Sequence, residues 1–411
     1  MKLRTLKQIK NLKNKLVLLR VDFNVPVKNG RIVSDERIRL SLPTIEYLLK
    51  KKAKVILLTH LGRPVGYNGK EKSGYDYKFT LRPIVKRAVE LLKRPIKFIE
   101  DQKIGRINDQ EIYFANVKNE IDKMKSGEIV ILENMRFFPE EAKEITELSK
   151  KIAGLGDLFV YDGFAVAHRA AASISGVAKY LPSFAGFLCE KEIIGLNKIM
   201  IKPKKPFVLI LGGVKMETKI PVLKALLPKA DHVLIGGGMV STYLWAKGYK
   251  VGKSVIDKDY KKEAMKYLGN KKVVMPLDVV AGDEKGLKIE VLKINSKFKI
   301  QNLKLGIYDI GPETIRLYAK YIKKAQTIVW NGPMGFFTIK PYRIGSLSIA
   351  RLVASRSKGK AFGVIGGGET LQVMDLTKMG EYVDLISTGG GAMLEFLAGN
   401  KLPGLKYLTT M

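Results

Sequence analysis

The chain has 411 residues, which is more than one hydrophobic core usually serves, because single domains tend to stop growing near about 250–300 residues. Hydrophobic residues make up 46% of it, and no uncharged apolar run approaches the roughly 18–20 residues that cross a bilayer. Residues 1–16 alternate basic and apolar side chains without the apolar core of a secretory signal. We therefore expect a soluble, cytoplasmic protein of two domains with no membrane partner.

The charge balance is strongly basic. Lys and Arg number 73 against 39 Asp and Glu, a formal net charge of +34, which suits nucleic acid, an anionic membrane or a polyanionic small substrate. The lysines are scattered singly or in pairs, and no arginine-rich or aromatic-interleaved tract occurs. This pattern favours a solvated lysine-rich surface, so we expect no specific nucleic-acid partner. A nucleic-acid-binding protein is the alternative from another functional class.

Short apolar runs recur along the chain, each followed by a loop and an amphipathic stretch. Runs of four to six apolar residues bounded in this way are typical of strands buried on both faces, and the helical stretches between them predict parallel βαβ units. We expect an α/β fold with two doubly wound, Rossmann-like parallel sheets. The segments that contain the runs are 15–23, 53–60, 128–134, 157–164, 207–213, 232–238, 272–280, 327–333, 361–368 and 385–391.

The domain boundary is predicted near residue 188. A helical pattern at about 187–202 runs into Pro203 and Pro206 before the next strand, and a helix joining two domains would permit hinge motion. We therefore expect an N-terminal domain over 1–188 and a C-terminal domain over 189–400.

The strand ends change character between the two halves. Before about residue 190 they carry polar side chains, among them several arginines, whose planar fork binds carboxylate or phosphate at two points. Ligands of open α/β sheets lie at the carboxyl ends of strands, so the first half is predicted to bind a small, multiply anionic substrate. The candidate residues are Asp22, Asn24, Arg37, His60, Arg63, Arg136 and Arg169.

In the second half, glycine runs follow the strands at 212–213, 236–238, 366–368 and 389–391. Glycine lets the backbone approach a nucleotide closely, and the helix that follows presents unpaired N–H groups to phosphate. A dinucleotide fingerprint is absent after the first strand, which argues against an NAD-dependent dehydrogenase. The segment 248–254 resembles a P-loop but has three residues between its glycines where four are needed.

These features favour phosphoryl transfer onto a group that is already anionic. Such a reaction needs alignment and neutralisation of charge instead of a strong base. Arginines, a lysine, helix N-termini and Mg²⁺ would suffice, and two closing domains would exclude water.

Several motifs resemble those of phosphoglycerate kinase, from about residue 16 to about residue 400. The first is RVDFNVP at 20–26, and the others follow in the same order along the chain. They are RIRLSLPTI at 37–45, THLGRP at 59–64, ILENMRF at 131–137, DGFAVAHRA at 162–170, LGGVKMETK at 211–219, IGGGM at 235–239, VWNGPMGFF at 329–337, IGGGET at 365–370 and STGGGAMLEFLAG at 387–399.

The resemblance implies reversible, Mg²⁺-dependent transfer between 1,3-bisphosphoglycerate and ADP, giving 3-phosphoglycerate and ATP in glycolysis and gluconeogenesis. Asp22, Asn24, Arg37, His60, Arg63, Arg136 and Arg169 would bind the triose, and Arg37, Lys219, Gly367 and Gly390 would act in catalysis. Nucleotide would be bound by Gly213, Lys215, Lys219, Gly237, Asn331, Pro333, Thr338, Gly367, Gly368, Glu369 and Thr370. The tail 401–411 would pack on the first domain. The oligomeric state, monomer or homodimer, stays open.

Two positions depart from the family pattern. Thr338 stands where many relatives have a glutamate that accepts from the ribose hydroxyls, and Glu369 stands where aspartate is usual near the metal. A threonine hydroxyl accepts only a neutral hydrogen bond, so we predict altered nucleotide affinity with catalysis retained. Glu369 is one methylene longer than aspartate and remains the candidate Mg²⁺ ligand.

Overall fold

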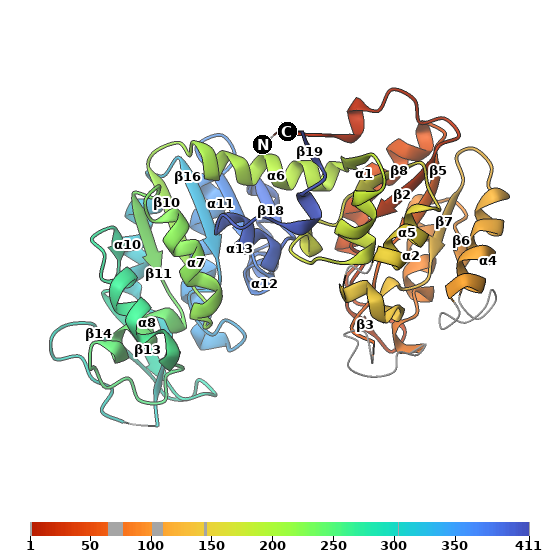
Figure 1. The fold of residues 1–411 in the computed structure, drawn as a ribbon. Coiled ribbons are helices and arrows are strands. Elements are labelled where there is room, and N and C mark those ends of the chain that lie inside the picture. Colours follow the sequence, from red (N-terminus) through yellow and green to blue (C-terminus); the bar gives the residue numbers. More distant parts are fainter. Residues whose placement is uncertain (1, 65–76, 101–109, 144–145, 303, 411) are drawn as a thin grey trace. The chain divides into compact units, whose positions relative to one another are not determined.

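The computed structural model describes residues 2–64, 77–100, 110–143, 146–302 and 304–410. The chain forms two compact units (Figure 1). The first unit is Met1–Ile193 together with Lys401–Met411, and the second unit is Ile194–Asn400. Helix α6 (Phe187–Ile201) contains the division between them. Within the described ranges, no helix is both long and apolar enough to cross a membrane.

Six described strands of the first unit form a parallel sheet. Its central strands are rich in Val, Leu and Ile and are buried on both faces, as parallel strands covered by helices require. In spatial order the strands are β6 (Lys97–Ile99), β7 (Ile129–Leu132), β5 (Lys54–Leu58), β2 (Leu16–Arg20), β8 (Leu158–Tyr161) and β9 (Ser183–Ala185).

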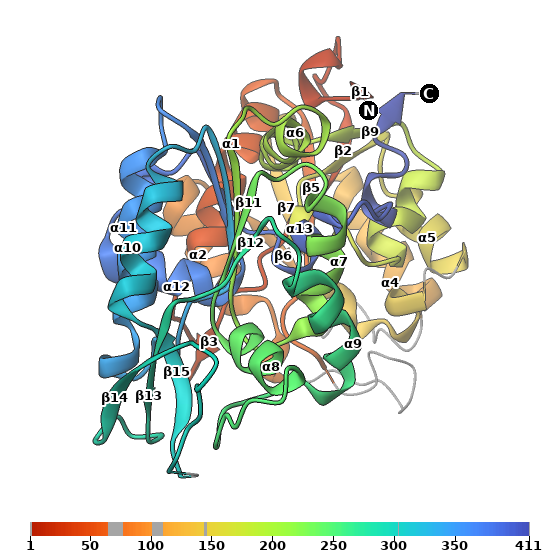
Figure 2. The ribbon, with the colours of Figure 1, turned by 90° about the vertical axis from the view of Figure 1, so that its left-hand side faces the viewer.

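Helices cover both faces of this sheet (Figure 2). Helices α1 (Glu36–Lys50) and α2 (Arg82–Leu92) share one hydrophobic core with alternate residues of β2 and β5. Helices α4 (Gln110–Asp122) and α5 (Thr146–Ala153) lie on the other face.

The two ends of the chain meet in the first unit. Strand β1 (Lys2–Leu3) pairs antiparallel with β19 (Thr409–Thr410), and the backbone N–H of Arg4 donates to the carbonyl of Leu408 at 2.7 Å. A short antiparallel pair, β3 (Val27–Lys28) and β4 (Arg31–Ile32), follows the first long strand.

The second unit contains another six described parallel strands. Numbered along the chain they lie in the order 3-2-1-4-5-6, and the order reverses between the first and the fourth, where open sheets bind ligands. In spatial order they are β12 (Val273–Val274), β11 (His232–Ile235), β10 (Phe207–Leu211), β16 (Thr327–Asn331), β17 (Phe362–Gly366) and β18 (Leu385–Ser387).

Helices again cover both faces (Figure 2). On one face lie α10 (Pro312–Ile322), α11 (Ile344–Arg356) and α12 (Gly368–Thr377). On the other lie α7 (Met216–Leu226), α8 (Gly238–Ala246) and α13 (Gly391–Leu397), with the short α9 (Lys261–Glu263) beside α8. The predicted doubly wound α/β fold is therefore confirmed.

One predicted strand is wrong in detail. The apolar segment 272–280 was expected to form a single strand, but Pro276 interrupts it, and the two parts join different sheets. Proline lacks the N–H that a central strand needs, which explains the break. The second part is β13 (Asp278–Gly282), the central strand of a small antiparallel sheet with β14 (Ile289–Lys293) and β15 (Gly306–Ile310).

Candidate active site

The first unit gathers polar side chains at the carboxyl ends of its strands. Asp22 follows β2, His60 follows β5, Arg136 follows β7 and Arg169 follows β8. These strands are neighbours and run parallel, so their carboxyl ends meet at the same edge of the sheet. The chain thereby brings residues from four separate segments to one place.

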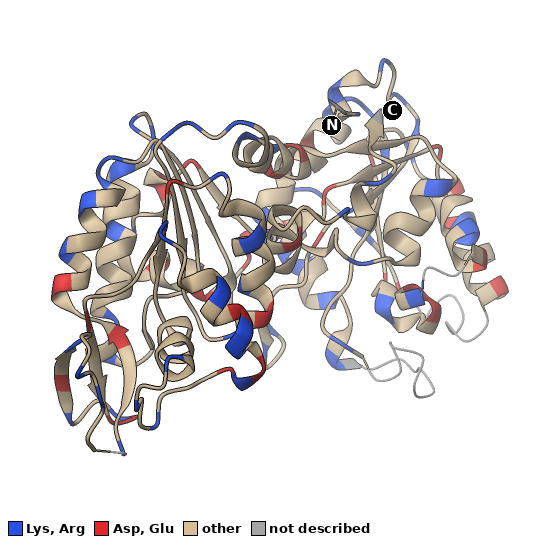
Figure 3. Ribbon diagram, turned by 60° about the vertical axis from the view of Figure 1, so that its left-hand side comes forward, with Lys and Arg blue, Asp and Glu red and all other residues tan. Residues whose placement is uncertain are grey.

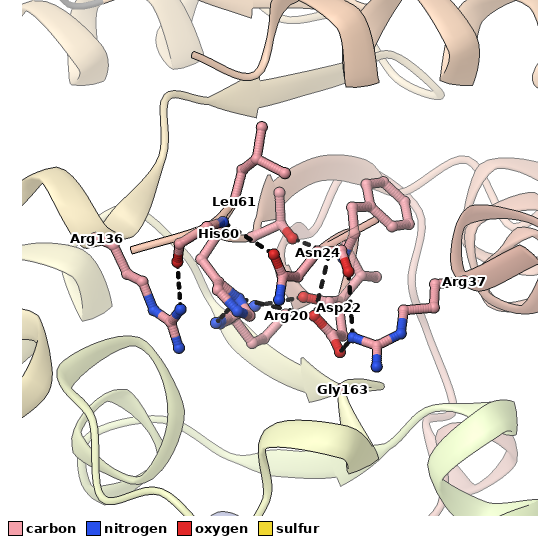
Figure 4. A network of polar contacts seen from close by, with 12 residues as sticks. Arg20, Asp22, Asn24, Arg37, His60, Leu61, Arg136 and Gly163 are labelled. Carbon is pink, nitrogen blue, oxygen red and sulfur yellow. Dashed lines mark hydrogen bonds and ion pairs between the residues drawn. The ribbon is translucent and has the colours of Figure 1, made fainter. Parts of the chain in front are cut away.

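Asp22 and Arg37 form the central ion pair of this edge (Figure 4). Nη1 of Arg37 lies 2.5 Å from Oδ2 of Asp22 and donates to the carbonyl oxygen of Asn24 at 3.3 Å. The backbone N–H of Asn24 donates to Oδ1 of Asp22 at 3.2 Å. Asp22 is buried, whereas the Arg37 side chain is 36% exposed, so part of its guanidinium faces solvent.

His60 lies buried among positive charges. Its Nδ1 is 3.2 Å from Nη2 of Arg20 and 3.8 Å from Oδ1 of Asp22. Burial, followed by the charges of nearby arginines, holds the pKa of His60 well below its usual value, so the ring is neutral at physiological pH. The arginines whose charges act on it are Arg20, Arg136, Arg169 and Arg37.

Hydrogen bonds fix the loop after β5 that carries His60. Oδ1 of Asn24 accepts from the N–H of Gly62 at 2.9 Å, and the N–H of Phe23 donates to the hydroxyl of Thr59 at 2.9 Å. Asn134, after β7, accepts from the N–H of Leu61 at 3.2 Å and donates to its carbonyl at 2.8 Å. The loops after three strands are therefore tied together before any substrate binds.

Part of the predicted triose set lines one cavity of about 250 Å³. Arg136 and Arg169 line it together with Arg20, which the sequence-based prediction omits. Arg63 is exposed and does not contribute to its wall, although its sequence motif groups it with the others.

Arg20 lies at the end of a buried strand, and its side chain is itself buried. Its Nε donates to the hydroxyl of Ser173 at 3.0 Å, and Ser173 in turn donates to Oε1 of Glu141 at 2.5 Å. Burial raises the pKa of Glu141. An arginine inside an otherwise apolar strand was the available signal for this network, because a buried charge requires partners.

The second unit holds a pocket of about 200 Å³ at the point where its strand order reverses. Five of the predicted nucleotide residues line it, and they come from the loops after β10, β11 and β16 and from the start of α12. These five are Gly213, Gly237, Pro333, Thr338 and Glu369.

Lys219 and Asn331 lie beside this pocket. The ammonium of Lys219 donates to Oδ1 of Asn331, and the amide of Asn331 donates to the carbonyl of Gly366 at 2.7 Å. Burial lowers the pKa of Lys219 to about 8, and the charge of Glu369 opposes this shift. A buried cation that pairs mainly with an amide is poised to meet an incoming anion.

Other predicted site residues do not line the pocket. The Thr370 hydroxyl accepts from the N–H of Gly332 at 2.7 Å and so joins the first turn of α12 to the loop after β16. Lys215 is exposed at the N-terminus of α7, and Gly390 precedes α13; neither lines the pocket.

The apolar wall of the pocket was not predicted. Val279 and Ile307 come from the small antiparallel sheet, and Tyr308 and Phe336 extend the same wall. The ring of Tyr308 stacks on Tyr342 with centroids 4.8 Å apart. Such a surface suits the flat face of a purine. Its residues on the small sheet belong to none of the recognised motifs, whereas Phe336 lies within VWNGPMGFF at 329–337.

The glycine runs contain two kinds of position. A Cβ on Gly212 would lie 2.1 Å from the carbonyl oxygen of Pro333, so this glycine permits two loops to touch. A Cβ on Gly368 would meet nothing within 4 Å. Only the second kind of glycine leaves room in which a ligand could approach the backbone.

A paired substitution distinguishes these uses. We expect Gly212→Ala to lower the free energy of unfolding by about 1–3 kcal/mol, the usual effect of overpacking. Gly368→Ala should leave thermal unfolding nearly unchanged but weaken ADP binding, measured by calorimetry, by about tenfold, or ~1.4 kcal/mol. Unchanged ADP affinity in a folded Gly368→Ala protein would show that this glycine does not serve the phosphates.

Two parallel sheets, an arginine-lined cavity in one unit and a glycine-lined pocket beside a buried lysine in the other suit a kinase. Residues 6–400 match the family model described as phosphoglycerate kinase, and the chain belongs to this family. Relatives and structural neighbours over nearly the whole chain are phosphoglycerate kinases, and the family catalyses this phosphoryl transfer in glycolysis.

The similarity extends over nearly the full length of several known proteins. A phosphoglycerate kinase of Dictyoglomus turgidum is 43% identical over 404 residues, 97% of this chain and 96% of that relative. One of Borreliella afzelii is 40% identical over 99% of this chain and all of the relative. The solved structure of phosphoglycerate kinase from Coxiella burnetii has a TM-score of 0.84 at 37% identity and covers 99% of this chain and 98% of its own. That from Pyrococcus horikoshii has a TM-score of 0.82 at 36% identity, with 98% of each chain covered.

Proposed function

We propose that the first unit binds 3-phosphoglycerate or 1,3-bisphosphoglycerate and that the second binds ATP or ADP. The observation that carries the first assignment is the convergence of four arginine charges on the buried, neutral His60. A multiply charged phosphate ester would compensate this field. The second assignment rests on the glycine-lined pocket at the reversal of strand order.

Within this proposal, Arg37 and Lys219 neutralise charge on the transferring phosphoryl group. Gly367 and Gly390 have positive φ angles of +98° and +49°, which lets the chain turn sharply before α12 and α13. The N–H groups that follow would face the phosphates. Helix α6, which belongs to both units, would serve as the hinge. A role in glycolysis supports a cytoplasmic location.

Mg²⁺ fits the residues that surround the nucleotide pocket. Among the described residues, no three His, Cys, Asp or Glu side chains gather as a metal cage. Mg²⁺ usually binds one or two carboxylates together with substrate phosphates and water, and the exposed Glu369 on the pocket wall supplies one carboxylate. Glu369 would hold the ion, which would neutralise phosphate charge.

Calorimetry on the full chain tests the division of ligands. Arg169→Ala should weaken binding of 3-phosphoglycerate by about tenfold or more, the effect of losing one charge-assisted contact, and leave ADP affinity unchanged. Lys219→Met should weaken ADP binding and leave the affinity for 3-phosphoglycerate unchanged. If either variant weakened both ligands equally, or the wrong one alone, the assignment of ligands to units would be incorrect.

Thr338 provides a further test within the nucleotide site. It lines the pocket and is exposed, so a longer side chain fits there without displacing the core. A hydrogen bond to a charged group is stronger than one between neutral groups by about 1 kcal/mol, so Thr338→Glu should tighten ADP binding by about fivefold.

The control for this prediction changes the ligand. Thr338→Glu should give no gain with an ADP analogue that lacks the ribose hydroxyls, and Thr338→Gln should give a smaller gain with ADP. Equal ADP affinity in Thr338→Glu and the unsubstituted protein would exclude a ribose contact at this position.

A further inference from the structure

A second basic pocket lies in the second unit, at the opposite end of the sheet from the nucleotide pocket. It borders the first residues of β16 and β17, Thr327 and Phe362, whereas the nucleotide pocket borders the residues that follow the strands. Its volume is about 800 Å³, within the range of about 300–1,000 Å³ typical of small-molecule sites.

Four lysines from two segments of the chain line this pocket. Lys198 lies on α6, Lys202 and Lys204 follow the helix, and Lys360 precedes β17. Among the described residues, no carboxylate forms an ion pair with any of these four. Neighbouring Lys205 differs, because its ammonium lies 3.1 Å from Oδ2 of Asp231.

Two described contacts involve these lysines, and neither neutralises an ammonium charge. The ammonium of Lys198 lies 4.8 Å from the centre of the Phe362 ring, and the hydroxyl of Thr327 donates to the carbonyl of Lys204 at 2.8 Å. Asp384 is the acidic residue that lines the pocket, and its Oδ2 accepts from the N–H groups of Lys358 and Gly363 at 3.1 and 2.8 Å. The Asp384 carboxylate is therefore already hydrogen-bonded to the backbone.

The electrostatics of the α6 C-terminus explain only part of this lysine cluster. Cations near a helix C-terminus are favoured, which accounts for lysines at the end of α6. It does not account for Lys360, which comes from the other wall, nor for the side-chain amides of Asn197 and Gln326 in the lining. Lysine acts as a point charge, so several separate ammonium groups suit a ligand with several closely spaced oxoanions.

We propose that this pocket, lined by Lys198, Lys202, Lys204 and Lys360, binds a soluble polyphosphorylated small molecule. Figure 3 shows Lys and Arg on many elements of both units, so the general basic charge must be separated from the pocket itself. A phospholipid headgroup also presents phosphate oxygens, so binding to lipid vesicles is measured separately.

The probe is inorganic tripolyphosphate, titrated into the full chain by calorimetry in magnesium-free buffer near physiological salt. Saturating ADP and 3-phosphoglycerate occupy the catalytic sites. The pocket variant replaces Lys198, Lys202, Lys204 and Lys360 by glutamine. The control variant removes the same charge at four exposed lysines elsewhere in the second unit, namely Lys271, Lys285, Lys297 and Lys320.

We expect one tripolyphosphate to bind the unsubstituted chain, with affinity reduced at least about 30-fold in the pocket variant and less than about threefold in the control. Lys360→Gln alone should weaken binding by about fivefold. Both fourfold variants should keep kcat within about twofold, since neither touches the catalytic site. Absence of binding, or equal weakening in both variants, would overturn the proposal, as would binding to phosphatidylglycerol vesicles without binding of tripolyphosphate.

Discussion

Arg37→Ala is expected to lower kcat for 3-phosphoglycerate phosphorylation by about 10²–10³-fold, the usual cost of removing one donor aimed at transition-state charge. Arg37 is held by Asp22 through a 2.5 Å ion pair, and its side chain is 36% exposed. Under the proposed function, its remaining N–H groups would donate to the phosphoryl group. The Michaelis constant for 3-phosphoglycerate should change by less than kcat, because the proposed interaction strengthens in the transition state.

The same helix supplies the control. Arg39 lies on α1, is more exposed than Arg37 and pairs with Asp35 at 2.8 Å. Arg39→Ala should keep activity within about twofold, as expected for an exposed pair worth less than ~1 kcal/mol. Arg37→Lys keeps the charge but loses the fork, so it should restore only part of kcat. A higher Michaelis constant with unchanged kcat in Arg37→Ala would assign Arg37 to substrate binding alone.

Lys219→Met is expected to have an effect of similar size, about 10²–10³ in kcat. The substitution keeps the volume of a buried side chain and removes only its charge, so thermal unfolding should show a folded protein. Lys224→Met, at an exposed position on the same helix, is the matched control and should leave kcat nearly unchanged. Wild-type turnover in Lys219→Met would remove Lys219 from the mechanism.

The pH profile gives an independent readout of the same residue. Because burial lowers the pKa of Lys219 to about 8, its ammonium is lost at a lower pH than that of an exposed lysine. The value of kcat/KM for nucleotide, which reports the free enzyme, should therefore fall as pH rises above about 8. Lys219→Met should lack this decline. A decline that persisted in the variant would belong to another group.

The sequence predicts that polar residues gather at one edge of the first sheet, because parallel strands place their carboxyl ends together. Asp22, His60 and Arg136 each follow a recognisable apolar run, so convergence follows from the fold alone. Arg20 escaped prediction because a charge within a strand is normally assigned to a solvent-facing end. Its buried partner Ser173 lies 153 residues away along the chain, and no local pattern connects them.

The pocket of the second unit is less predictable for two physical reasons. Its apolar wall comes partly from β13 and β15, which form a separate sheet after Pro276 interrupts the apolar segment. The glycine runs indicate close approach of the backbone, but the sequence cannot distinguish a glycine that admits a ligand from one that admits another loop. The atoms around Gly212 and Gly368 show that the first permits contact between loops and that the second leaves open space.

The most direct test of the whole account is a coupled assay of the purified, folded chain with ATP and 3-phosphoglycerate, with and without Mg²⁺. We predict turnover that requires both substrates and Mg²⁺, falls about 10²–10³-fold in Arg37→Ala and is retained in Arg39→Ala. No turnover by folded protein with all components present, or full turnover by Arg37→Ala, would contradict it.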